Sequence, residues 1–275
     1  MTGVAGAAGL GCRTAASPER GRLLRIEEVP MAEIRRRRSV SATFLLDLLA
    51  SQLRGLDPTG APLEVVDLGG GTGGVATALA GHGHRVTVID PSPDALASLE
   101  RRTAEAGLEG RIRARQGDAA DLIDVVGERS VDVVVCHRVL EVVESPADAL
   151  SAVAAVLRPA GALSLLASQR KAAVLGHALA GHIALARRAW EDHRRFDYDG
   201  LVALLADAGF TVQSSHGIGA LADHVAESVL DAEPGAFAAL TALEAEISED
   251  PAFRALAPQV HLFARVGLST PAAVD

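Results

Sequence analysis

The amino-acid sequence predicts an α/β fold in which helices cover both faces of a mostly parallel sheet. From residue 64 onward, short strand-like runs alternate with helical segments, and this alternation is typical of a parallel sheet. One run, VDVVVC at 131–136, is apolar or nearly so throughout, as expected of a strand that is buried on both sides. The 275 residues, 49% of them apolar, are enough for one large domain with a sizeable core.

The predicted elements follow one another in a regular order. Apolar residues at helical spacing predict a first helix around Phe44 to Leu53, while Pro93 marks the start of a later helix and Gly209 the end of another. The predicted strands cover 64–68, 85–90, 111–116, 131–136, 162–168, 210–214 and 259–266. The predicted helices between them cover 72–80, 93–106, 146–157 and 201–208.

We expect one domain over 31–268, between two tails. Residues 1–30 are small, polar and interrupted by proline, so little fixed structure is expected there, and 269–275 form the second tail. Met31 directly follows the first tail and is a second candidate for the start of translation. An insert at 170–198, after the fifth strand, is expected to cap the substrate site.

The composition argues against several classes of protein. Lys+Arg 26 against Asp+Glu 35 gives a net charge of −9, which disfavours a nucleic-acid coat or binding to an anionic membrane surface. The most apolar helical stretch, 172–186, is too short to span a bilayer. Two cysteines allow neither a disulfide framework nor a cysteine-rich zinc site, and they suit a reducing compartment. Because no signal peptide is evident either, we expect a cytoplasmic protein.

A glycine-rich loop, VDLGGGTGG, connects the first strand to the helix that follows it. Glycines allow a tight turn and let the backbone approach a ligand closely, and the free N–H groups of the helix start face the same crevice. Gly69, Gly71 and Gly74 match the dinucleotide pattern G-x-G-x-x-G. Asp67, Gly69, Gly71 and Gly73 match the acidic-x-G-x-G-x-G pattern of class I methyltransferases that use S-adenosylmethionine.

Acidic residues at the ends of three successive strands favour the second pattern. Asp67 would repel a pyrophosphate, whereas it suits a ligand that carries a sulfonium cation and an amino group. Asp90 ends the second strand, where a carboxylate can accept from both ribose hydroxyls. Asp118 follows the third strand, where an adenine edge would lie. The alternative is that Asp67 and Asp118 only cap helices.

Residues 64–168 resemble the class I S-adenosylmethionine-dependent methyltransferase superfamily. The motifs VVDLGGGTGG, VTVIDPS, RARQGDAADL, VDVVVCHRVLEVV and VLRPAGALSLL occur here in the order of that family. The resemblance implies a Rossmann-like fold with a seven-stranded sheet, whose last strand, QVHLFARV, is antiparallel. It also implies S-adenosylmethionine as the cofactor.

A closer resemblance, to bacterial tRNA 5-carboxymethoxyuridine methyltransferases, extends to about residue 225 through AGHIALARRAW and GIGALADHVAE. It implies a carboxylate on a tRNA wobble uridine as the methyl acceptor. The cofactor-binding positions that it implies are Arg37 or Arg38, Gly69, Gly70, Gly71, Asp90, Ala119, Ala120 and His137.

Two departures from that family bear on the acceptor. Ser168-Gln169 stand where the family often has an aromatic residue and asparagine, and arginines among acids at 187–188 and 194–195 replace a lysine-rich stretch. Phosphate affinity depends on clustered cations. A small metabolite is therefore the alternative acceptor, and the net charge favours it.

Methyl transfer requires few protein groups. The sulfonium already activates the methyl group, so placement of the acceptor supplies much of the acceleration, and a base is needed only if the acceptor must lose a proton. His137 and Glu141 are the candidate bases, and Arg138 and Gln169 are further polar residues at strand ends. Alternatively, His137 packs against the cofactor and Glu141 bonds a helix end.

The insert concentrates the scarce aromatic residues. Trp190, Phe196 and Tyr198 lie within nine residues, next to Arg194 and Arg195. These side chains either form a substrate site for an anionic acceptor or fasten the insert to the domain.

Other features of the insert point to structure. Leu175, Leu179 and Ile183 predict one apolar helical stripe. His177 and His182, five residues apart, do not share a helix face, so we expect no metal site.

Two other classes of protein could carry the same glycine loop. A nicotinamide-dependent oxidoreductase should carry a pair such as Tyr-x-x-x-Lys, but no lysine follows Tyr198, the sole tyrosine. A non-catalytic cofactor-binding module would have no open channel to the sulfonium.

Overall fold

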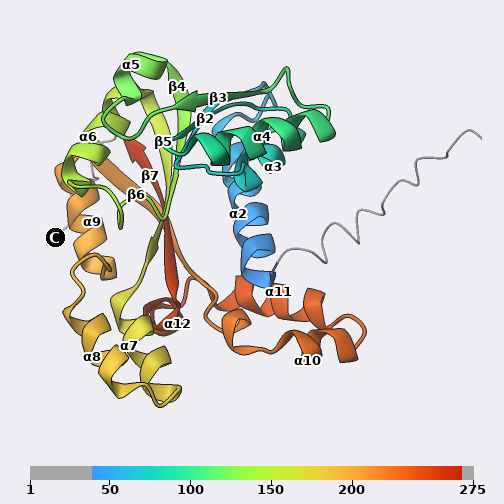
Figure 1. Cartoon of the computed structure of the whole chain (residues 1–275), viewed down its shortest axis with the longest axis vertical. Coiled ribbons are helices and arrows are strands. Elements are labelled where there is room, and N and C mark those ends of the chain that lie inside the picture. The colour runs from blue at the N-terminus through green and yellow to red at the C-terminus, as the bar shows by residue number, and fades with distance from the viewer. Residues whose placement is uncertain (1–38, 268–275) are drawn as a thin grey trace, which may run out of the picture. The chain divides into compact units, whose positions relative to one another are not determined.

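Seven strands form one sheet in the order β3-β2-β1-β4-β5-β7-β6 in the computed structural model, which describes residues 39–267 (Figure 1). Neighbouring strands from β3 to β5 are parallel, and β7 is antiparallel to both β5 and β6. The predicted sheet, mostly parallel with an antiparallel last strand, is confirmed. The strands are β1 Glu64–Leu68, β2 Arg85–Asp90, β3 Ile112–Gln116, β4 Val131–His137, β5 Leu157–Ser168, β6 Phe210–Ile218 and β7 Gln259–Val266.

Helices cover both faces of this sheet, as predicted. One face packs against α2 Val40–Leu56, α3 Gly74–Gly81 and α4 Pro93–Glu105. The other packs against α5 Leu122–Val126, α6 Pro146–Val156 and α9 Tyr198–Asp207. Successive residues of a strand point to opposite faces, so Val135 of β4 joins the first core and Cys136 the second, each 0% exposed. This is why β4 needs an apolar residue at nearly every position.

Serine hydroxyls start three of these helices. Ser39, Ser92 and Ser145 each accept a hydrogen bond from the N–H three residues later, at the start of α2, α4 and α6. Proline follows directly at Pro93 and Pro146, where a helix needs no N–H donor. The helix start predicted at Pro93 is therefore confirmed.

Several predicted boundaries were wrong. Helix α3, which follows the glycine loop, starts at Gly74 and not at residue 72, because Gly73 adopts a left-handed conformation at φ 78°. Strand β5 starts at Leu157, whose backbone already pairs with Val131, so the segment 158–161 belongs to the strand. Strand β6 continues to Ile218 because β7 pairs with it along its whole length.

Two insertions lie at the same end of the sheet (Figure 1). The expected one after β5 contains α7 Arg170–Leu179 and α8 Ile183–Glu191. An unexpected one after β6 contains the short 3-10 helix η1 Ala222–His224, α10 Glu227–Ala232, α11 Ala236–Ile247 and α12 Pro251–Leu256. Because β6 runs in the same direction as β5, both insertions begin at the sheet edge that carries the glycine loop.

The β5 insertion is closed at its base. Phe196 donates from its N–H to Ser168 O at 3.1 Å and accepts from Arg170 N at 3.1 Å, and an ion pair joins Arg170 to Asp197. Phe196 also packs against the core beneath α6 and α9. The residue therefore fastens the insertion to the domain.

The prediction that the insertion carries one apolar helical stripe was wrong. A break at 180–182 separates α7 from α8, so Leu179 and Ile183 lie on different helices and are 73% and 67% exposed. Within residues 39–267, no helix is both long and apolar enough to cross a bilayer. The predicted tails at 1–30 and 269–275, and the arginine at position 38, lie outside the described residues.

Candidate functional site

The glycine loop between β1 and α3 depends on its glycines for its shape. Gly69 has φ 66° and Gly73 has φ 78°, a region that other residues rarely adopt. A Cβ atom on Gly69 would lie 2.7 Å from a methyl group of Val139, and one on Gly73 would lie 2.1 Å from a methyl group of Leu99. The loop backbone is thus packed directly against the domain, and Gly70 and Gly71 complete the turn between these two points.

Asp90, at the end of β2, is hydrogen-bonded to this loop. Its Oδ2 accepts from Gly71 N at 2.9 Å, and its Oδ1 accepts from Ser92 N at 2.9 Å. The carboxylate is 8% exposed and still lines the adjoining cavity. Each oxygen retains a lone pair that can accept from a ligand hydroxyl.

Asp67, at the end of β1, lies beneath the loop. Its Oδ2 is buried and has no hydrogen-bond partner among the described residues. A Cβ atom on Gly70 would lie only 2.5 Å from this oxygen. Burial raises the pKa of the Asp67 carboxyl to about 7, the neighbouring charge of Asp90 adds to the rise, and an N–H group of Ala76 opposes it. Asp67 is therefore a buried acid with one unpaired oxygen, directly beneath the glycine loop.

The first cavity opens beside these groups and measures about 670 Å³. Five of the predicted cofactor residues line it: Gly69, Asp90, Asp118, Ala119 and Ala120. The carboxylate of Asp118 accepts from Ala120 N at 2.8 Å and so shapes the turn after β3, and Ala119 is 6% exposed. An acid, an apolar slot and backbone groups thus meet at the edge of β1, β2 and β3, which suits a nucleoside.

Of the further residues of this cavity, Arg138 was expected as a polar residue at a strand end, whereas the three valines were not expected from the sequence. Arg138, Val139, Val142 and Val143, which follow β4, line its other wall. The mostly apolar run VLEVV at 139–143 was the feature of the sequence that indicated this wall, because an adenine ring needs apolar surface on both sides.

His137 does not line the first cavity. Its ring lies on the sheet face that carries α2, where Nε2 is 2.9 Å from Ser164 Oγ. Burial lowers the pKa of the His137 imidazole to about 3, so the ring is neutral at physiological pH. Glu141 holds the neighbouring strand, because its Oε1 accepts from Ser168 N at 2.6 Å.

A second cavity, of about 310 Å³, lies at the end of β5 between the two insertions. Two predicted substrate residues, Gln169 and Arg195, line it. Apolar residues, among them Leu175, Leu256 and Pro258, line it together with charged or polar groups that were not expected at a substrate site. These are His177 from α7 and Asp223 with His224 from η1.

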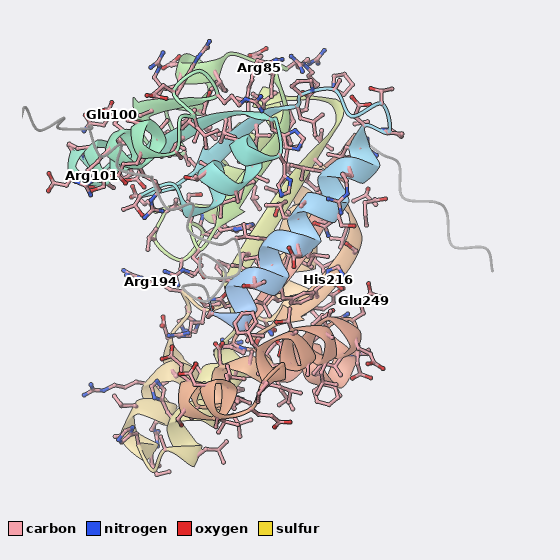
Figure 2. All side chains as sticks on the ribbon, turned by 90° about the vertical axis from the view of Figure 1, so that its right-hand side faces the viewer. Arg85, Glu100, Arg101, Arg194, His216 and Glu249 are labelled. Carbon is pink, nitrogen blue, oxygen red and sulfur yellow. The ribbon has the colours of Figure 1, made fainter. Side chains whose placement is uncertain are left out.

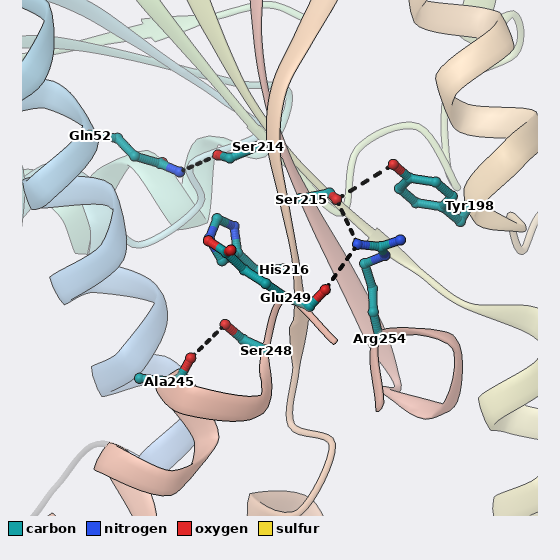
Figure 3. Close-up of polar contacts among 9 residues, drawn as sticks. All are labelled: Gln52, Tyr198, Ser214, Ser215, His216, Ala245, Ser248, Glu249 and Arg254. Atoms are coloured by element: carbon teal, nitrogen blue, oxygen red, sulfur yellow. Dashed lines mark hydrogen bonds and ion pairs between the residues drawn. The ribbon is translucent and has the colours of Figure 1, made fainter. Parts of the chain in front are cut away.

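Three other predicted substrate residues lie outside both cavities. Tyr198 packs under the guanidinium of Arg254, 4.3 Å from the ring centre, with its hydroxyl 3.4 Å from Ser215 Oγ (Figure 3). Trp190 is 58% exposed and packs 5.3 Å from the guanidinium of Arg170. Arg194 is exposed (Figure 2).

Gln169 has a structural role in addition to lining the second cavity. Its side-chain N–H groups donate to Arg254 O at 2.6 Å and to Ala257 O at 2.8 Å, so they hold the end of α12 against β5. The position is 3% exposed. Gln169 therefore joins the two insertions at the base of the cavity.

Comparison with known families and proteins agrees with this geometry. Residues 66–165 match the family described as "Methyltransferase domain". The chain is 26% identical over 212 residues to the tRNA 5-carboxymethoxyuridine methyltransferase of Escherichia coli O157:H7, covering 74% of this chain and 80% of the relative. It is 31% identical over 183 residues to the ubiquinone biosynthesis O-methyltransferase of Methylocella silvestris, covering 61% of this chain and 68% of the relative.

Solved structures share the fold. A putative sarcosine dimethylglycine methyltransferase from Galdieria sulphuraria superposes with a TM-score of 0.57 at 18% identity, covering 80% of this chain and 84% of that one. The plantazolicin methyltransferase BamL, solved with S-adenosylhomocysteine, superposes with a TM-score of 0.55 at 16% identity, covering 83% and 85%. The chain belongs to the class I S-adenosylmethionine-dependent methyltransferases, and S-adenosylmethionine is its cofactor.

Proposed function

We propose that this methyltransferase acts on a small acceptor that carries an acidic group and binds in the second cavity. The observation that carries the proposal is the lining of that cavity, in which Arg195, His177 and His224 lie among apolar side chains and face a single carboxylate, Asp223. A guanidinium binds a carboxylate with two parallel hydrogen bonds, and apolar side chains suit a carbon skeleton. Its volume of about 310 Å³ fits a small molecule.

The charges of the β5 insertion support a small acceptor over a nucleic acid. Arg187 pairs with Glu191 at 3.2 Å, Arg195 lies 3.7 Å from Asp192, and Arg170 pairs with Asp197. Cations that are neutralised by neighbouring carboxylates attract phosphates weakly. The pairs of Arg187 with Glu191 and of Arg170 with Asp197 therefore weaken a phosphate site on the insertion, whereas Arg195, at the longest of the three distances, can exchange Asp192 for an acceptor carboxylate.

We assign the cofactor to the first cavity and the glycine loop. When bound, S-adenosylmethionine supplies a methyl group activated by a sulfonium. Asp90 would hold the ribose, the turn from Asp118 to Ala120 the adenine edge, and the loop backbone the amino-acid end. Its buried, unpartnered oxygen makes Asp67 suitable for the cationic side of the ligand. The resemblance adds Arg38 for the carboxylate.

A tRNA wobble uridine is the second candidate acceptor. It is favoured by the similarity to a tRNA 5-carboxymethoxyuridine methyltransferase, which extends over 74% of this chain. In that case the carboxylate would itself be the methyl acceptor.

The deciding experiment uses S-adenosylmethionine labelled in its methyl group. The protein is incubated with bulk bacterial tRNA and, separately, with a small-molecule extract of bacterial cells. We expect label in the small-molecule fraction and none in tRNA. Label in tRNA alone, resistant to removal of small molecules, would overturn the proposal in favour of the second candidate.

A further inference from the structure

The second cavity contains two opposite charges that do not pair with each other. Arg195 comes from the β5 insertion and Asp223 from η1 in the insertion after β6. Among the described residues that line the cavity, these two carry a formal charge at pH 7. Opposite charges in one small cavity attract each other. The structure describes both side chains, however, and no ion pair joins them, because each is held by a different neighbour.

Arg195 is held on its own side of the cavity by Asp192. Its Nε lies 3.7 Å from Asp192 Oδ2, on the turn that follows α8. Both side chains are partly exposed, and an ion pair of this kind contributes little to stability. The guanidinium also has further N–H donors in a fixed, planar arrangement. An acidic group of the acceptor can therefore bind Arg195 in place of Asp192.

Asp223 is fixed from three directions, although it is exposed. Its Oδ1 accepts from the Ser41 hydroxyl of α2 at 2.7 Å. Gly219 packs against its carboxylate so closely that a Cβ atom there would lie 2.8 Å from Asp223 Cγ. The preceding segment 220–222 donates three N–H groups to Glu244, a fully buried acid of α11. Figure 1 shows the start of α2 beside α11, so these supports come from neighbouring helices.

The second carboxylate oxygen of Asp223 remains available to a ligand. Within the described part of the chain, Oδ2 has no hydrogen-bond or ion-pair partner. A carboxylate oxygen only accepts, and its strongest hydrogen bonds are those from a cationic N–H donor. The link to Ser41 uses Oδ1, and an uncharged asparagine could form it equally well. That link therefore does not account for the negative charge at the cavity.

We propose that the acceptor is dipolar, with an acidic group that binds Arg195 and an amine that binds Asp223. The inference rests on the proposed function. A ligand with an acidic group alone would bring its negative charge near Asp223 and be repelled by it. A ligand with both groups pairs each charge of the cavity, while its carbon skeleton contacts apolar residues such as Leu175 and Leu256. The chemical class is an amino acid or a related aminocarboxylic acid, and Asp223 is a residue that determines this specificity.

The first test examines the labelled product of the deciding experiment above. The product is separated from unreacted S-adenosylmethionine and passed over a cation exchanger at about pH 2, where amines are charged and carboxylic acids are not. We expect retention, because a methylated amine remains basic and methylation elsewhere leaves the amine unchanged. A small-molecule product that is not retained would overturn the inference and leave the proposed function intact. Label in tRNA alone would instead overturn the proposed function.

The second test measures the contribution of Asp223 with the same labelling reaction. The rate is followed over a dilution series of the extract for wild type, Asp223→Asn and a control, Asp231→Asn. Asparagine at 223 can still accept from Ser41, so this variant removes the charge alone, while Asp231 is an exposed acid of α10 outside the cavity lining. We expect Asp223→Asn to raise the KM for the extract by about five- to tenfold. The kcat and the affinity for S-adenosylhomocysteine should be unchanged, and the control should resemble the wild type. An unchanged KM in Asp223→Asn would overturn the inference.

The third test identifies the group that Asp223 binds. The protein with bound S-adenosylhomocysteine is titrated calorimetrically with phenylalanine and with 3-phenylpropanoate, which has the same skeleton and acid but no amine. We expect the wild type to prefer phenylalanine by about five- to tenfold and Asp223→Asn to show no preference. A wild type without this preference, or a preference that Asp223→Asn retains, would overturn the inference. Arg195→Ala should weaken both probes, and unchanged binding of both would count against the proposed function.

Discussion

The N–H of Gly71 donates to Asp90 Oδ2 over 2.9 Å, so the end of β2 holds the glycine loop of β1. The same carboxylate lines the first cavity. One side chain thus both shapes the loop and faces the ligand. Removing it should affect the cofactor more than the fold.

Asp90→Ala should weaken binding of S-adenosylhomocysteine by about 1.5–3 kcal/mol, because hydrogen bonds to a charged acceptor are lost. Calorimetric titration of wild type and variant measures this difference. Asp94→Ala is the control, since Asp94 is an exposed acid in the first turn of the same α4. Equal affinities of wild type and Asp90→Ala would remove Asp90 from the site.

Asp67 should make cofactor binding depend on pH. Its pKa of about 7 means that the carboxyl is largely neutral below that pH. A cationic ligand favours the carboxylate, so the affinity for S-adenosylmethionine should rise with pH, by up to about tenfold per unit, and level off above the pKa. In Asp67→Asn this rise should be absent. A pH profile that is the same in both proteins would contradict the assignment.

Asp67 should also make the stability of the ligand-free protein depend on pH. Folding raises the pKa of the Asp67 carboxyl from its ordinary value of 3.8 to about 7, so the folded state binds the proton more tightly. The protonated Asp67 carboxyl contributes its full share to the free energy of unfolding below its pKa in the unfolded chain. This contribution is lost as the pH rises through its pKa in the folded protein. Urea unfolding should show that the advantage of Asp67→Asn over wild type grows from acidic to mildly alkaline pH.

Glu244→Gln should loosen the rim of the second cavity. Glu244 is 0% exposed, and its carboxylate accepts from the N–H groups of Ala220, Leu221 and Ala222, at 2.6, 3.1 and 3.0 Å. An amide can accept fewer of these bonds and turns an N–H toward another, so the free energy of unfolding should fall by about 2–4 kcal/mol. Chemical denaturation measures the loss, and Glu246→Gln, an exposed acid on the same α11, should change little.

Glu244→Gln should also affect binding in the second cavity without affecting binding in the first. The loop that Glu244 holds leads into η1, which supplies Asp223 and His224 to the second cavity. We therefore expect a higher KM for the acceptor and an unchanged dissociation constant for S-adenosylhomocysteine. Weakened cofactor binding with normal acceptor kinetics would show that the second cavity is not the acceptor site.

Arg195→Ala should raise the acceptor KM, and Arg195→Lys should restore little, because a lysine cannot form two parallel bonds to a carboxylate. Steady-state kinetics with the acceptor from the labelling experiment tests both. The control is Arg187→Ala, whose exposed arginine pairs with Glu191 on the outer side of α8. Recovery of full activity in Arg195→Lys would mean that the residue acts only through its charge.

Local patterns were reliable where one physical signal dominated. The almost wholly apolar run of β4, the serine-proline start at Pro93 and the glycine loop each follow from a short stretch of sequence. The helices of the insertion after β6 were not predicted, because α10 and α12 are only six residues long and α11 has one buried residue, Glu244. Such helices lack the apolar stripe by which a helix is recognised.

The order of the strands along the chain, the family and the acids at the strand ends follow from the amino-acid sequence alone, because these depend on local periodicity and on motifs of adjacent residues. Which distant side chains meet follows only from the folded chain. Cross-strand pairing puts His261 opposite His216, and Ser164 between His261 and His137, although these residues lie up to 124 positions apart in the chain. No local signal encodes such neighbours, since they depend on strand order and register.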